Sequence, residues 1–351
     1  MKSEGAAEHQ PDRGGADSSP FTLHPSPVLV IQTAFLGDVV LTTPLLAALA
    51  ARHGPVDVLT TPAAAPLLAT HPAVRQVISF DKHGRDRGWI GGIRVAGQLR
   101  REGYARAYLP HRSWRSGALA LVARIPERIG FADGARFFYT ETRPRPASGH
   151  EVERLLALAG GSDAGSAPPV DLVLTEADRA AADRWLTEHG VTPGFIAVAP
   201  GSIWGTKRWP YYDALVAALD GSVVVVGGPD DRGLADEIAQ AAPGRVHNSA
   251  GELPLRVSAA IIQRSRLLVT NDSAPLHLAT AVGTPIVAIF GPTVPAFGFG
   301  PRGPRDLVVE HPNLSCRPCS RHGPMRCPLG HHRCMRELTL ETVLATIKAI
   351  G

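Results

Sequence analysis

Short apolar runs alternate with helical patterns along both halves of this chain of 351 residues. Such runs are typical of strands in a parallel sheet, because helices cover both faces of the sheet and leave little room for polar side chains. The alternation therefore predicts an α/β fold with doubly wound parallel sheets. In the first half, the strand-like runs are 28–33, 56–61, 76–80, 105–110 and 128–131, and the helical patterns include 39–53, 89–102 and 113–123.

A stretch rich in Gly, Ser and Pro interrupts this pattern at residues 160–169. The composition is typical of a linker, and a chain of this length exceeds the usual size of one domain. We therefore expect an N-terminal Rossmann-like domain at residues 27–160, a linker at 161–169 and a C-terminal Rossmann-like domain at 170–337. The strand-like runs of the second half are 195–199, 222–226, 267–270 and 286–290.

Residues 1–26 are rich in Gly, Ser, Asp, Pro and His and contain few apolar side chains, so we expect a disordered tail. The net charge of +4 comes from scattered arginines that do not alternate with aromatic residues, which argues against a nucleic-acid partner. A mildly basic surface suits anionic lipid headgroups or a phosphorylated glycolipid. No run is long and apolar enough to span a bilayer or to form a signal-peptide core. We therefore expect a cytoplasmic protein that contacts membrane lipid only at the surface.

The segment 269–280 joins an apolar run to a helical pattern through Asn271, Asp272 and Ser273. Small side chains that carry oxygen often cap helices, and this is the simpler interpretation of Asp272 and Ser273. The free N–H groups of a first helical turn also bind anions, so we expect Asp272, Ser273 and Ala274 to offer their N–H groups to a diphosphate. Because an Asp carboxylate repels phosphate, the side chain of Asp272 should cap the helix or bind a sugar hydroxyl.

A second loop follows the strand-like run 195–199 and has the same organisation. It begins with a Pro-Gly pair, supplies hydroxyl groups at Ser202 and Thr206, and supplies a positive charge at Lys207. We expect the next helix to open at residues 209–210, because proline is tolerated in a first helical turn. A solvated surface pair of cations is the other interpretation of Lys207 and its neighbour. Two such loops in one half of the chain predict a single nucleotide site.

Asp38 lies just after the first strand-like run, 28–33, at the start of the helical pattern 39–53. Considered locally, it is equally well interpreted as the N-cap of that helix. However, ligands of open α/β sheets bind at the carboxyl ends of the strands, which is where Asp38 falls. Asp38 is therefore also a candidate catalytic residue.

These three segments, in this order, resemble the motifs of glycosyltransferase family 9, the ADP-heptose:lipopolysaccharide heptosyltransferases, and more closely its heptosyltransferase II branch. The resemblance extends over nearly the whole chain after residue 27. It implies the GT-B fold, in which two Rossmann-like domains face each other across a cleft, and a C-terminal helix, residues 338–351, that packs back on the N-terminal domain. The matched motifs are Leu36-Gly37-Asp38 with Thr42-Thr43-Pro44, Pro200-Gly201-Ser202 through Lys207-Arg208-Trp209-Pro210, and Asp272-Ser273-x-Pro275-x-His277-x-Ala279 with Gly291-Pro292-Thr293.

The resemblance also implies roles for the matched residues. Asp38 corresponds to the general base that takes the proton of the acceptor hydroxyl, and Lys207 to a lysine that contacts the donor phosphates. An acidic contact to the ribose is implied near Asp230 and Asp231. Transfer with inversion at the anomeric carbon and without a catalytic cofactor or metal is implied too, and no Asp-x-Asp pair is placed to bind a divalent cation. The other substrate-binding candidates are Gly37, Thr42, Ser202, Thr206, Asp272, Ser273, Ala274 and His277.

His277 lies one turn into the predicted helix that follows Ser273. A lone His in a helix is more often a packing residue than a ligand-binding one. We therefore expect His277 to brace the neighbouring loop and not to contact the substrate directly.

All four cysteines of the chain lie in one Cys-rich segment, residues 316–334. In a reducing compartment, a Cys-x-x-Cys pair followed by two further thiols favours a metal over disulfides. We therefore expect a structural zinc site, or a site for another soft metal, that stabilises the segment and takes no part in catalysis. Free thiols or a redox-labile pair are the alternative, because the spacing after the first pair is irregular. The candidate ligands are Cys316, Cys319, Cys327 and Cys334.

Together with the resemblance, these residues predict an enzyme that moves a heptosyl residue from ADP-L-glycero-D-manno-heptose to the inner core of lipopolysaccharide. Its partners would be this nucleotide sugar, a lipid-linked core oligosaccharide and the cytoplasmic face of the inner membrane. Three alternatives stay open: another nucleotide sugar with another glycan acceptor, a GT-B-like nucleotide-sugar epimerase, and a non-catalytic nucleotide-sugar-binding module.

Overall fold

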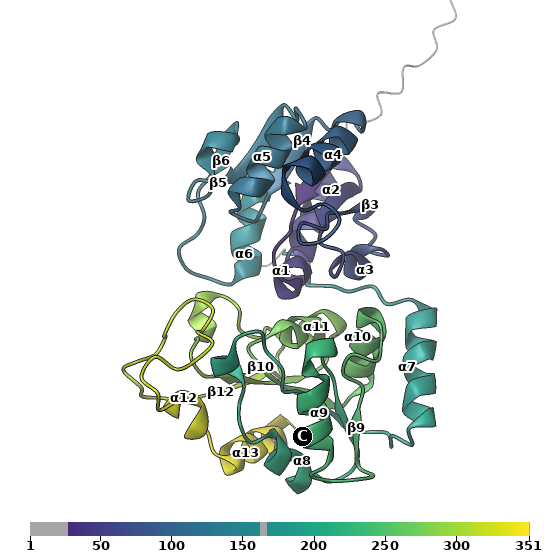
Figure 1. Ribbon diagram of the computed structural model, residues 1–351, viewed down its shortest axis with the longest axis vertical. Coiled ribbons are helices and arrows are strands. Elements are labelled where there is room, and N and C mark those ends of the chain that lie inside the picture. The colour runs from purple at the N-terminus through teal and green to yellow at the C-terminus, as the bar shows by residue number, and fades with distance from the viewer. Residues whose placement is uncertain (1–26, 162–166, 351) are drawn as a thin grey trace, which may run out of the picture.

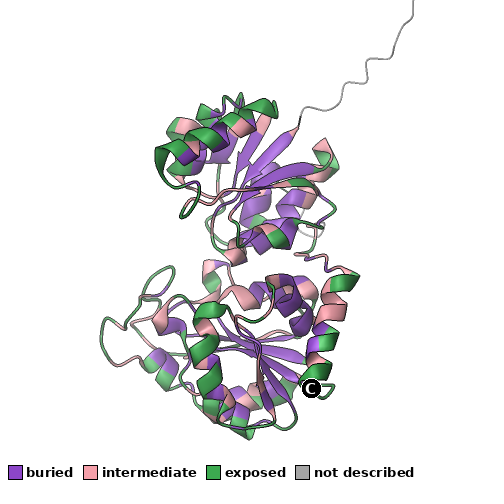
Figure 2. Ribbon diagram, turned by 45° about the vertical axis from the view of Figure 1, so that its right-hand side comes forward, coloured by how far each residue is buried: buried purple, intermediate pink, exposed green. Residues whose placement is uncertain are grey.

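The structure is a computed structural model that describes residues 27–161 and 167–350. The predicted tail, 1–26, and most of the predicted linker lie outside the described residues. The chain forms two parallel six-stranded sheets with helices packed on both faces of each (Figure 1). The central strands of both sheets are buried along their whole length (Figure 2). The predicted α/β fold class is therefore confirmed.

The N-terminal sheet consists of β1 (Val28–Ile31), β2 (Val56–Thr60), β3 (Val74–Ser79), β4 (Arg106–Leu109), β5 (Glu127–Phe131) and β6 (Glu141–Arg143). All neighbouring pairs are parallel, in the order β3-β2-β1-β4-β5-β6. Val30 of β1 lies opposite Val58 of β2 and Tyr108 of β4. The strand order reverses between β1 and β4, which creates a switch point at the carboxyl edge of the sheet.

The C-terminal sheet consists of β7 (Ile196–Ala199), β8 (Val223–Val225), β9 (Val246–Asn248), β10 (Leu267–Asn271), β11 (Ile286–Phe290) and β12 (Leu307–Glu310). Its strands are also all parallel, in the order β12-β11-β10-β7-β8-β9. Taken from β9, this order is that of the N-terminal sheet, with the switch point between β7 and β10. The two domains therefore repeat one topology.

The helices of the N-terminal domain divide between the two faces of its sheet. Leu45 and Val152, from two helices on one face, pack against Val30, while Leu99 and Leu119 pack in a second core on the other face. The helices of the first face are α1 (Leu36–Leu41), α2 (Thr43–His53) and α6 (Glu151–Leu156), and those of the second are α4 (Gly88–Arg101) and α5 (Trp114–Val122). The short elements are α3 (Ala65–Leu68), η1 (Arg136–Phe138) and η2 (Ala157–Ala159).

The helices of the C-terminal domain enclose its sheet in the same way. Trp185, Ile261 and Leu276 are buried in the core on one face, and Leu215 and Ile347 in the core on the other. The helices are α7 (Glu176–Glu188), α8 (Tyr212–Ala218), α9 (Arg232–Ala239), α10 (Leu255–Arg264), α11 (Ala274–Val282), α12 (Arg333–Arg336) and α13 (Leu340–Ile350). The 3-10 turns are η3 (Gly205–Lys207), η4 (Pro229–Asp231) and η5 (Pro295–Phe297).

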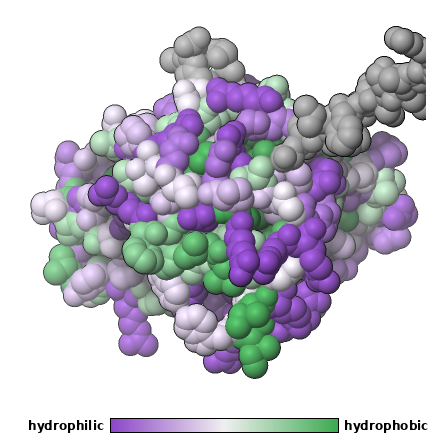
Figure 3. All heavy atoms as spheres, turned by 90° about the horizontal axis from the view of Figure 1, so that it is seen from above, coloured by the Kyte–Doolittle hydropathy of each residue, from purple (hydrophilic) through white to green (hydrophobic). Residues whose placement is uncertain are grey.

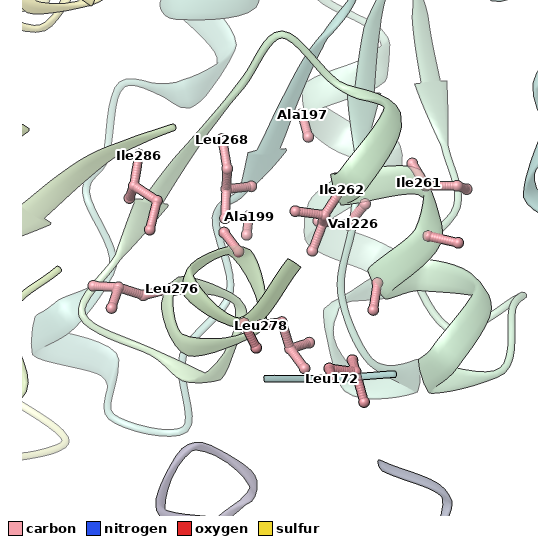
Figure 4. Packing of buried hydrophobic residues seen from close by; sticks show 14 of the residues in the cluster. Leu172, Ala197, Ala199, Val226, Ile261, Ile262, Leu268, Leu276, Leu278 and Ile286 are labelled. Carbon is pink, nitrogen blue, oxygen red and sulfur yellow. The ribbon is translucent and has the colours of Figure 1, made fainter. Parts of the chain in front are cut away.

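One hydrophobic core crosses the boundary between the domains. Val40 of α1 and Leu67 of α3 belong to the same buried cluster as Leu276 and Leu278 of α11. Leu172, which follows the linker, also lies in this cluster (Figure 4). Because apolar side chains from both domains are removed from water together, their burial stabilises the contact between the domains.

Polar contacts fasten the same boundary at two further places. Nη1 of Arg256 in α10 donates a hydrogen bond to the backbone oxygen of Pro66 at 3.1 Å. At α6, Nη1 of Arg154 donates to the backbone oxygen of Phe297 at 2.6 Å. The domains are therefore joined beside α10 and beside α6 as well as through the shared core.

The predicted return of the last helix to the N-terminal domain is wrong. α13 packs against α8, β11 and β12 of the C-terminal domain, far from the N-terminal domain in Figure 1. Val343 and Ile347 of α13 are buried in the core of that domain. Just before the helix, the backbone oxygen of Leu338 accepts a hydrogen bond from Nε1 of Trp209 at 2.8 Å. The apolar face of α13 is thus covered within the C-terminal domain.

The helix predicted over 39–53 starts earlier, at Leu36, and is divided into α1 and α2. A continuous helix would need a hydrogen bond from the backbone nitrogen of Pro44 to the oxygen of Val40, and proline has no N–H. Oγ1 of Thr43 donates to that oxygen at 2.8 Å instead. The second helix therefore begins afresh at Thr43.

Candidate functional site

The loop of residues 200–208 lies beside the junction of β10 and α11, because β7 and β10 are neighbours in the sheet. Asn271, the last residue of β10, holds both ends of this loop. Its Nδ2 donates to the backbone oxygen of Pro200 at 2.7 Å, and its Oδ1 accepts from the backbone nitrogen of Trp209 at 3.2 Å. This contact keeps Trp209 buried outside any helix, so α8 starts at Tyr212, later than predicted.

A buried ion pair joins the two predicted nucleotide motifs. Nζ of Lys207 lies 2.6 Å from Oδ2 of Asp272 and 3.1 Å from the backbone oxygen of Asp272. Oγ1 of Thr293 donates to the same Oδ2 at 2.7 Å. The interpretation of Lys207 as a solvated surface cation is therefore wrong. Since an ammonium has three N–H groups and two point at Asp272, one is left for an incoming ligand.

The first turn of α11 lies next to this ion pair. Ser273 is the N-cap residue of α11, but its side chain makes no capping hydrogen bond. Ala274 is the first residue of the helix. Their N–H groups have no acceptor within the helix, as at any helix start, and suit an anion. Asp272 departs from the prediction: its N–H donates to the backbone oxygen of Ile289 at 3.2 Å, because the residue still continues the β10–β11 ladder. With its carboxylate bonded to Lys207, Asp272 neither caps α11 nor offers an N–H to a diphosphate.

His277 of α11 meets Gly37 of α1 at the boundary between the domains. A Cβ on Gly37 would lie 2.5 Å from Cδ2 of His277, so this contact requires glycine. Burial lowers the pKa of His277 to about 4, and the positive charge of Lys207 acts in the same direction. The imidazole is therefore neutral at neutral pH and fills space between the domains, a position that suits the predicted bracing role.

Asp38 lies in the first turn of α1, and the N-cap residue is Phe35, so the interpretation of Asp38 as the cap is wrong. Burial, followed by the negative charge of Glu151 in α6, raises the pKa of Asp38 to about 6. The positive charge of Arg145 acts in the opposite direction. A carboxylate with this pKa is a stronger base than an ordinary Asp and is still ionised at neutral pH.

Thr42 supports Asp38 from inside the protein. Its Oγ1 donates to the backbone oxygen of Asp38 at 2.7 Å and accepts from Nε2 of Gln32 at 3.0 Å. The side chain is only 1% exposed. Thr42 therefore holds the turn that carries Asp38, and its predicted direct contact with substrate does not fit this arrangement.

The two hydroxyl groups of the 200–208 loop have different surroundings. Oγ of Ser202 accepts a hydrogen bond from the backbone nitrogen of Trp204 at 3.2 Å, which leaves its own hydrogen available to a ligand. Oγ1 of Thr206 donates to the backbone oxygen of Pro324, and the side chain is 3% exposed. Ser202 stays a substrate-binding candidate, whereas Thr206 is occupied with the Cys-rich segment.

The two acidic residues of the turn after β8, Asp230 and Asp231, have different surroundings. Asp231 points back towards the 200–208 loop: its Oδ2 accepts from the backbone nitrogen of Gly228 at 3.0 Å, and a Cβ on Gly201 would overlap its carboxylate. Asp230 is exposed at the same edge of the sheet. Asp231 therefore braces the loop, and Asp230 stays the candidate for a ribose contact.

The Cys-rich segment forms part of the wall of this site. The backbone oxygen of Pro324 accepts from both the nitrogen and Oγ1 of Thr206, and Nε2 of His332 lies 2.8 Å from the oxygen of Thr206. The nitrogen of Cys319 donates to the oxygen of Pro292 at 2.9 Å. The segment thus packs on the loop that carries Lys207. The prediction of a purely structural segment did not include this contact with the site.

His322 of this segment is a site residue that the sequence did not reveal. Its ring lies 6.1 Å from the ring of Trp204, in a stacked orientation, and 6.3 Å from that of Phe35 in the N-terminal domain. Burial lowers the pKa of His322, followed by the positive charge of Lys207 and, more weakly, of Arg112. His322 thus bridges the two domains near Lys207. No local pattern marks it, because it lies in an irregular segment.

The four thiols of the predicted metal site lie in different surroundings. In the part of the chain that the structure describes, no group of three or more His, Cys, Asp or Glu side chains is placed to hold a metal ion. Cys319 is exposed and Cys334 is buried, and burial raises the pKa of Cys334 to about 11. For Cys327, burial is outweighed by hydrogen bonds from the backbone of residues 329–332, which lower its pKa. Zinc binding stays a prediction for this segment.

Known sequences resemble the chain over most of its length. Residues 93–328 match the family described as glycosyltransferase family 9 (heptosyltransferase). Lipopolysaccharide heptosyltransferase 2 of Escherichia coli K12 is 30% identical to the chain over 350 residues, which cover 92% of the chain and 98% of that relative. Lipooligosaccharide heptosyltransferase 2 of Haemophilus influenzae is 25% identical over 348 residues, which cover 92% of the chain and 99% of that relative.

Solved structures resemble the chain across both domains. ADP-heptose lipopolysaccharide heptosyltransferase II of Escherichia coli has a TM-score of 0.74 at 26% identity, with 92% of this chain and 98% of that chain covered. A glycosyl transferase of family 9 from Veillonella parvula has a TM-score of 0.81 at 24% identity, with 95% and 99% covered, a likeness of fold. The predicted GT-B architecture is therefore confirmed.

Proposed function

Because the chain belongs to glycosyltransferase family 9, the heptosyltransferases, it is an enzyme that transfers a glycosyl group, and we propose that it moves heptose from ADP-L-glycero-D-manno-heptose to the inner core of lipopolysaccharide. The similarity to heptosyltransferase 2 of Escherichia coli over 92% of the chain supports this donor and acceptor. One observation about the site carries the proposal. The contact of Gly37 with His277 brings the turn of Asp38 to α11, beside Lys207.

Asp38 is the general base of the proposed reaction. With a pKa of about 6, it is ionised at neutral pH and takes the proton of the acceptor hydroxyl while the hydroxyl oxygen bonds to the anomeric carbon. The bond from that carbon to the diphosphate breaks, and its electron pair leaves with ADP. Attack from the side opposite the diphosphate inverts the anomeric configuration.

Lys207 and α11 hold the leaving diphosphate in this proposal. The remaining N–H of Lys207 and the N–H groups of Ser273 and Ala274 are directed at the negative charge, and the helix dipole adds to them. These groups supply charge stabilisation from the protein itself, so transfer proceeds without a catalytic metal. Asp272 fixes the position of Lys207 and keeps oxygen lone pairs for a sugar hydroxyl.

The acceptor in this proposal is a lipid-linked core oligosaccharide, and the enzyme works at the cytoplasmic face of the inner membrane. A truncated acceptor that ends in an inner-core heptose therefore tests the function directly. Acceptor and ADP-heptose are incubated with the full chain in EDTA, and the products are weighed by mass spectrometry. We expect a mass gain of one heptose that Asp38→Asn abolishes and the control Asp220→Asn, at an exposed position of the C-terminal domain, retains.

Other results of the same experiment identify the other functions. An isomer formed from the donor without acceptor would indicate an epimerase. Donor binding without any turnover would indicate a binding module. Turnover with a different nucleotide sugar or glycan would keep the reaction class and change the substrates.

A structural zinc ion in the Cys-rich segment belongs to the proposal as a stabiliser and not as a reactant. Metal analysis of the purified protein should find about one ion per chain, and replacement of Cys334 by Ser should release it. A preparation that is free of metal and fully active would overturn the zinc site and leave the transfer reaction standing.

A further inference from the structure

Helix α4 exposes large apolar side chains to solvent. Val95 and Leu99 on its inner side are buried in the N-terminal domain. On its outer side, near the start of the helix, Trp89 is 81% exposed, Ile90 85% and Ile93 63%. The first half of α4 therefore exposes large apolar side chains, although only the inner side of the helix packs against the domain.

Helix α5 and the turn η1 extend the same surface. Trp114 and Val122 of α5 are 53% and 55% exposed, and Phe137 of η1 is 90% exposed. α5 packs beside α4, and Gly117 of α5 lies against Phe138 of η1. Seen from above the N-terminal domain, hydrophobic side chains lie open among hydrophilic ones (Figure 3). We name the surface of these three elements the α4–α5 face; it consists of Trp89, Ile90, Ile93, Trp114, Leu121, Val122 and Phe137.

Exposed apolar side chains are concentrated on this face. Of the twelve large hydrophobic residues exposed among the described residues, seven lie on α4, α5 and η1. The other five are Phe35 in the N-terminal domain and, in the C-terminal domain, Ile203 in the 200–208 loop, Val308 on β12, and Met325 and Leu329 in the Cys-rich segment. Single exposed apolar residues are normal, whereas a contiguous patch marks a surface that another molecule covers.

The segment that contains the α4–α5 face is more positive than the chain as a whole. Residues 81–137 contain twelve Lys and Arg against five Asp and Glu, whereas the net charge of the whole chain is only +4. Arg87, Arg115 and Arg136, each within two residues of an apolar member of the face, are exposed. Asp86, by contrast, is buried in ion pairs with arginines. The apolar patch therefore has a positive rim.

We propose that the α4–α5 face docks on the surface of an anionic lipid bilayer. Apolar and aromatic side chains that project from an amphipathic helix enter the boundary between headgroups and acyl chains, and arginines around them bind lipid phosphates. Tryptophan, present twice on this face, is enriched at that boundary because its ring is apolar and its N–H is polar. Between residues 27 and 161 and between 167 and 350, no helix is long and apolar enough to cross a bilayer.

A second copy of the chain fits the face less well. A symmetric dimer places the same patch of each subunit against the other, so the positive rims of two copies would face each other. Like charges brought together in this way repel. Lipid phosphates neutralise the same arginines, which favours the bilayer as the occupant.

The α4–α5 face lies on the side of the N-terminal domain that suits a lipid-linked acceptor. α4 follows β3, and α5 follows β4, so both helices start at the carboxyl edge of the sheet, where Asp38 also lies. Trp89 and Trp114 stand at these starts. An acceptor anchored in the bilayer could extend its sugars from the face towards Asp38. This last step rests on the proposed function, whereas docking itself does not.

Sedimentation with vesicles tests the docking. The full chain is mixed with vesicles of phosphatidylcholine alone or with phosphatidylglycerol, and the bound fraction is measured against lipid concentration. We expect binding to the anionic vesicles that weakens as salt is raised. Trp89→Ser/Ile90→Ser and Arg87→Glu/Arg136→Glu should each lower the partition coefficient about tenfold or more. The matched controls Leu329→Ser and Arg184→Glu/Arg266→Glu, exposed in the C-terminal domain, should bind as the unmodified chain does.

Three results would overturn the docking surface: no binding to anionic vesicles, binding that survives both double substitutions, or an equal loss in the controls. A concentration-dependent dimer in analytical ultracentrifugation that the Trp89 and Ile90 substitutions dissociate would also overturn it, and would assign the face to a second copy. Turnover on a lipid-free acceptor is measured separately. If vesicle binding follows the expectation and no heptose is transferred, the proposed function fails and the docking surface stands.

Discussion

Gly37 of α1 and His277 of α11 are in such close contact that a Cβ on Gly37 would lie 2.5 Å from Cδ2 of His277. This contact joins the domain of Asp38 to the domain of Lys207. Because Gly37 precedes Asp38 directly, a displacement here moves the proposed base relative to the diphosphate site.

We expect Gly37→Ala to lower kcat/KM by about 10- to 100-fold, because the added methyl group displaces either the imidazole or the turn of Asp38. Steady-state kinetics measure the effect, with Gly233→Ala in α9 as the control, since a Cβ there meets open space. His277→Ala removes the obstacle, so the double variant should be no less active than His277→Ala alone. Additive losses would contradict the steric explanation.

The rate should depend on the ionisation of Asp38. Since its carboxylate is the base and its pKa is about 6, kcat/KM should rise with pH up to about 6 and then level off. Glu151→Gln removes the negative charge that helps to raise this pKa, so the rise should move to lower pH. A pH–rate profile of both enzymes measures the shift. An unchanged midpoint in Glu151→Gln would mean that another group titrates.

Asp38→Asn should stabilise the protein at high pH while it abolishes transfer. The fold raises the pKa of Asp38 from 3.8 to about 6, so it favours the neutral carboxyl. The contribution of Asp38 to stability is thus full below pH 4 and is lost as the pH rises through about 6. Asparagine is never charged, so the variant should gain up to about 3 kcal/mol over the parent at pH 8 and much less at pH 4. Urea unfolding at both pH values measures the difference. Equal stability of variant and parent at pH 8 would rule out a raised pKa of Asp38 in the folded protein.

Thr293 should act as a positioning residue for the Lys207–Asp272 pair. Thr293→Val removes the hydrogen bond to Oδ2 of Asp272 and should cost roughly 1–3 kcal/mol in stability and about tenfold in kcat/KM. Thr293→Ser keeps the hydroxyl and should restore both. Lys207→Ala leaves the carboxylate buried without its partner and should cost more, roughly 3–5 kcal/mol. Failure of Thr293→Ser to rescue Thr293→Val kinetics would show that the methyl group, and not the hydroxyl, matters.

His322 should contribute through its ring and not through a charge. Burial lowers its pKa, so the imidazole is neutral at neutral pH and can pack between Phe35 and Trp204. His322→Phe should therefore keep most of the activity, while His322→Ala should raise the KM of a substrate and lower kcat/KM about tenfold. His331→Ala, in the same segment, serves as the control. Equal losses in Phe and Ala variants would instead indicate a hydrogen bond from the imidazole.

The predictable part of the fold is the part with a strong local signal. The central strands are largely apolar because helices cover both faces of each sheet, and these runs were found from the sequence, as were the helices that follow β1, β3, β4, β7 and β10. β6, β9 and β12 lie at sheet edges. β6 and β9 read Glu-Thr-Arg and Val-His-Asn, and an edge strand needs no apolar run because only one side has a partner.

The sequence predicts which loops form the site, but it does not predict which residues of different loops contact each other. Lys207 and Asp272 were each expected near phosphate, but their pairing depends on the adjacency of β7 and β10, which local patterns do not encode. The same holds for Asp38 and Glu151, whose elements meet only in the folded domain. The last helix was misplaced because its position was inferred from the GT-B resemblance and not from its own residues, which pack in the core of the C-terminal domain.

Each domain completes its own sheet and its own switch point, so the two halves of the reaction centre belong to separate domains of one chain. Catalysis therefore depends on how the two domains are aligned. A substitution at Val40 or Leu67, in the core that both domains share, could leave each half native and nucleotide binding intact and still give an idle enzyme. Such a variant has misaligned domains, and a ligand that binds both domains at once should restore their alignment.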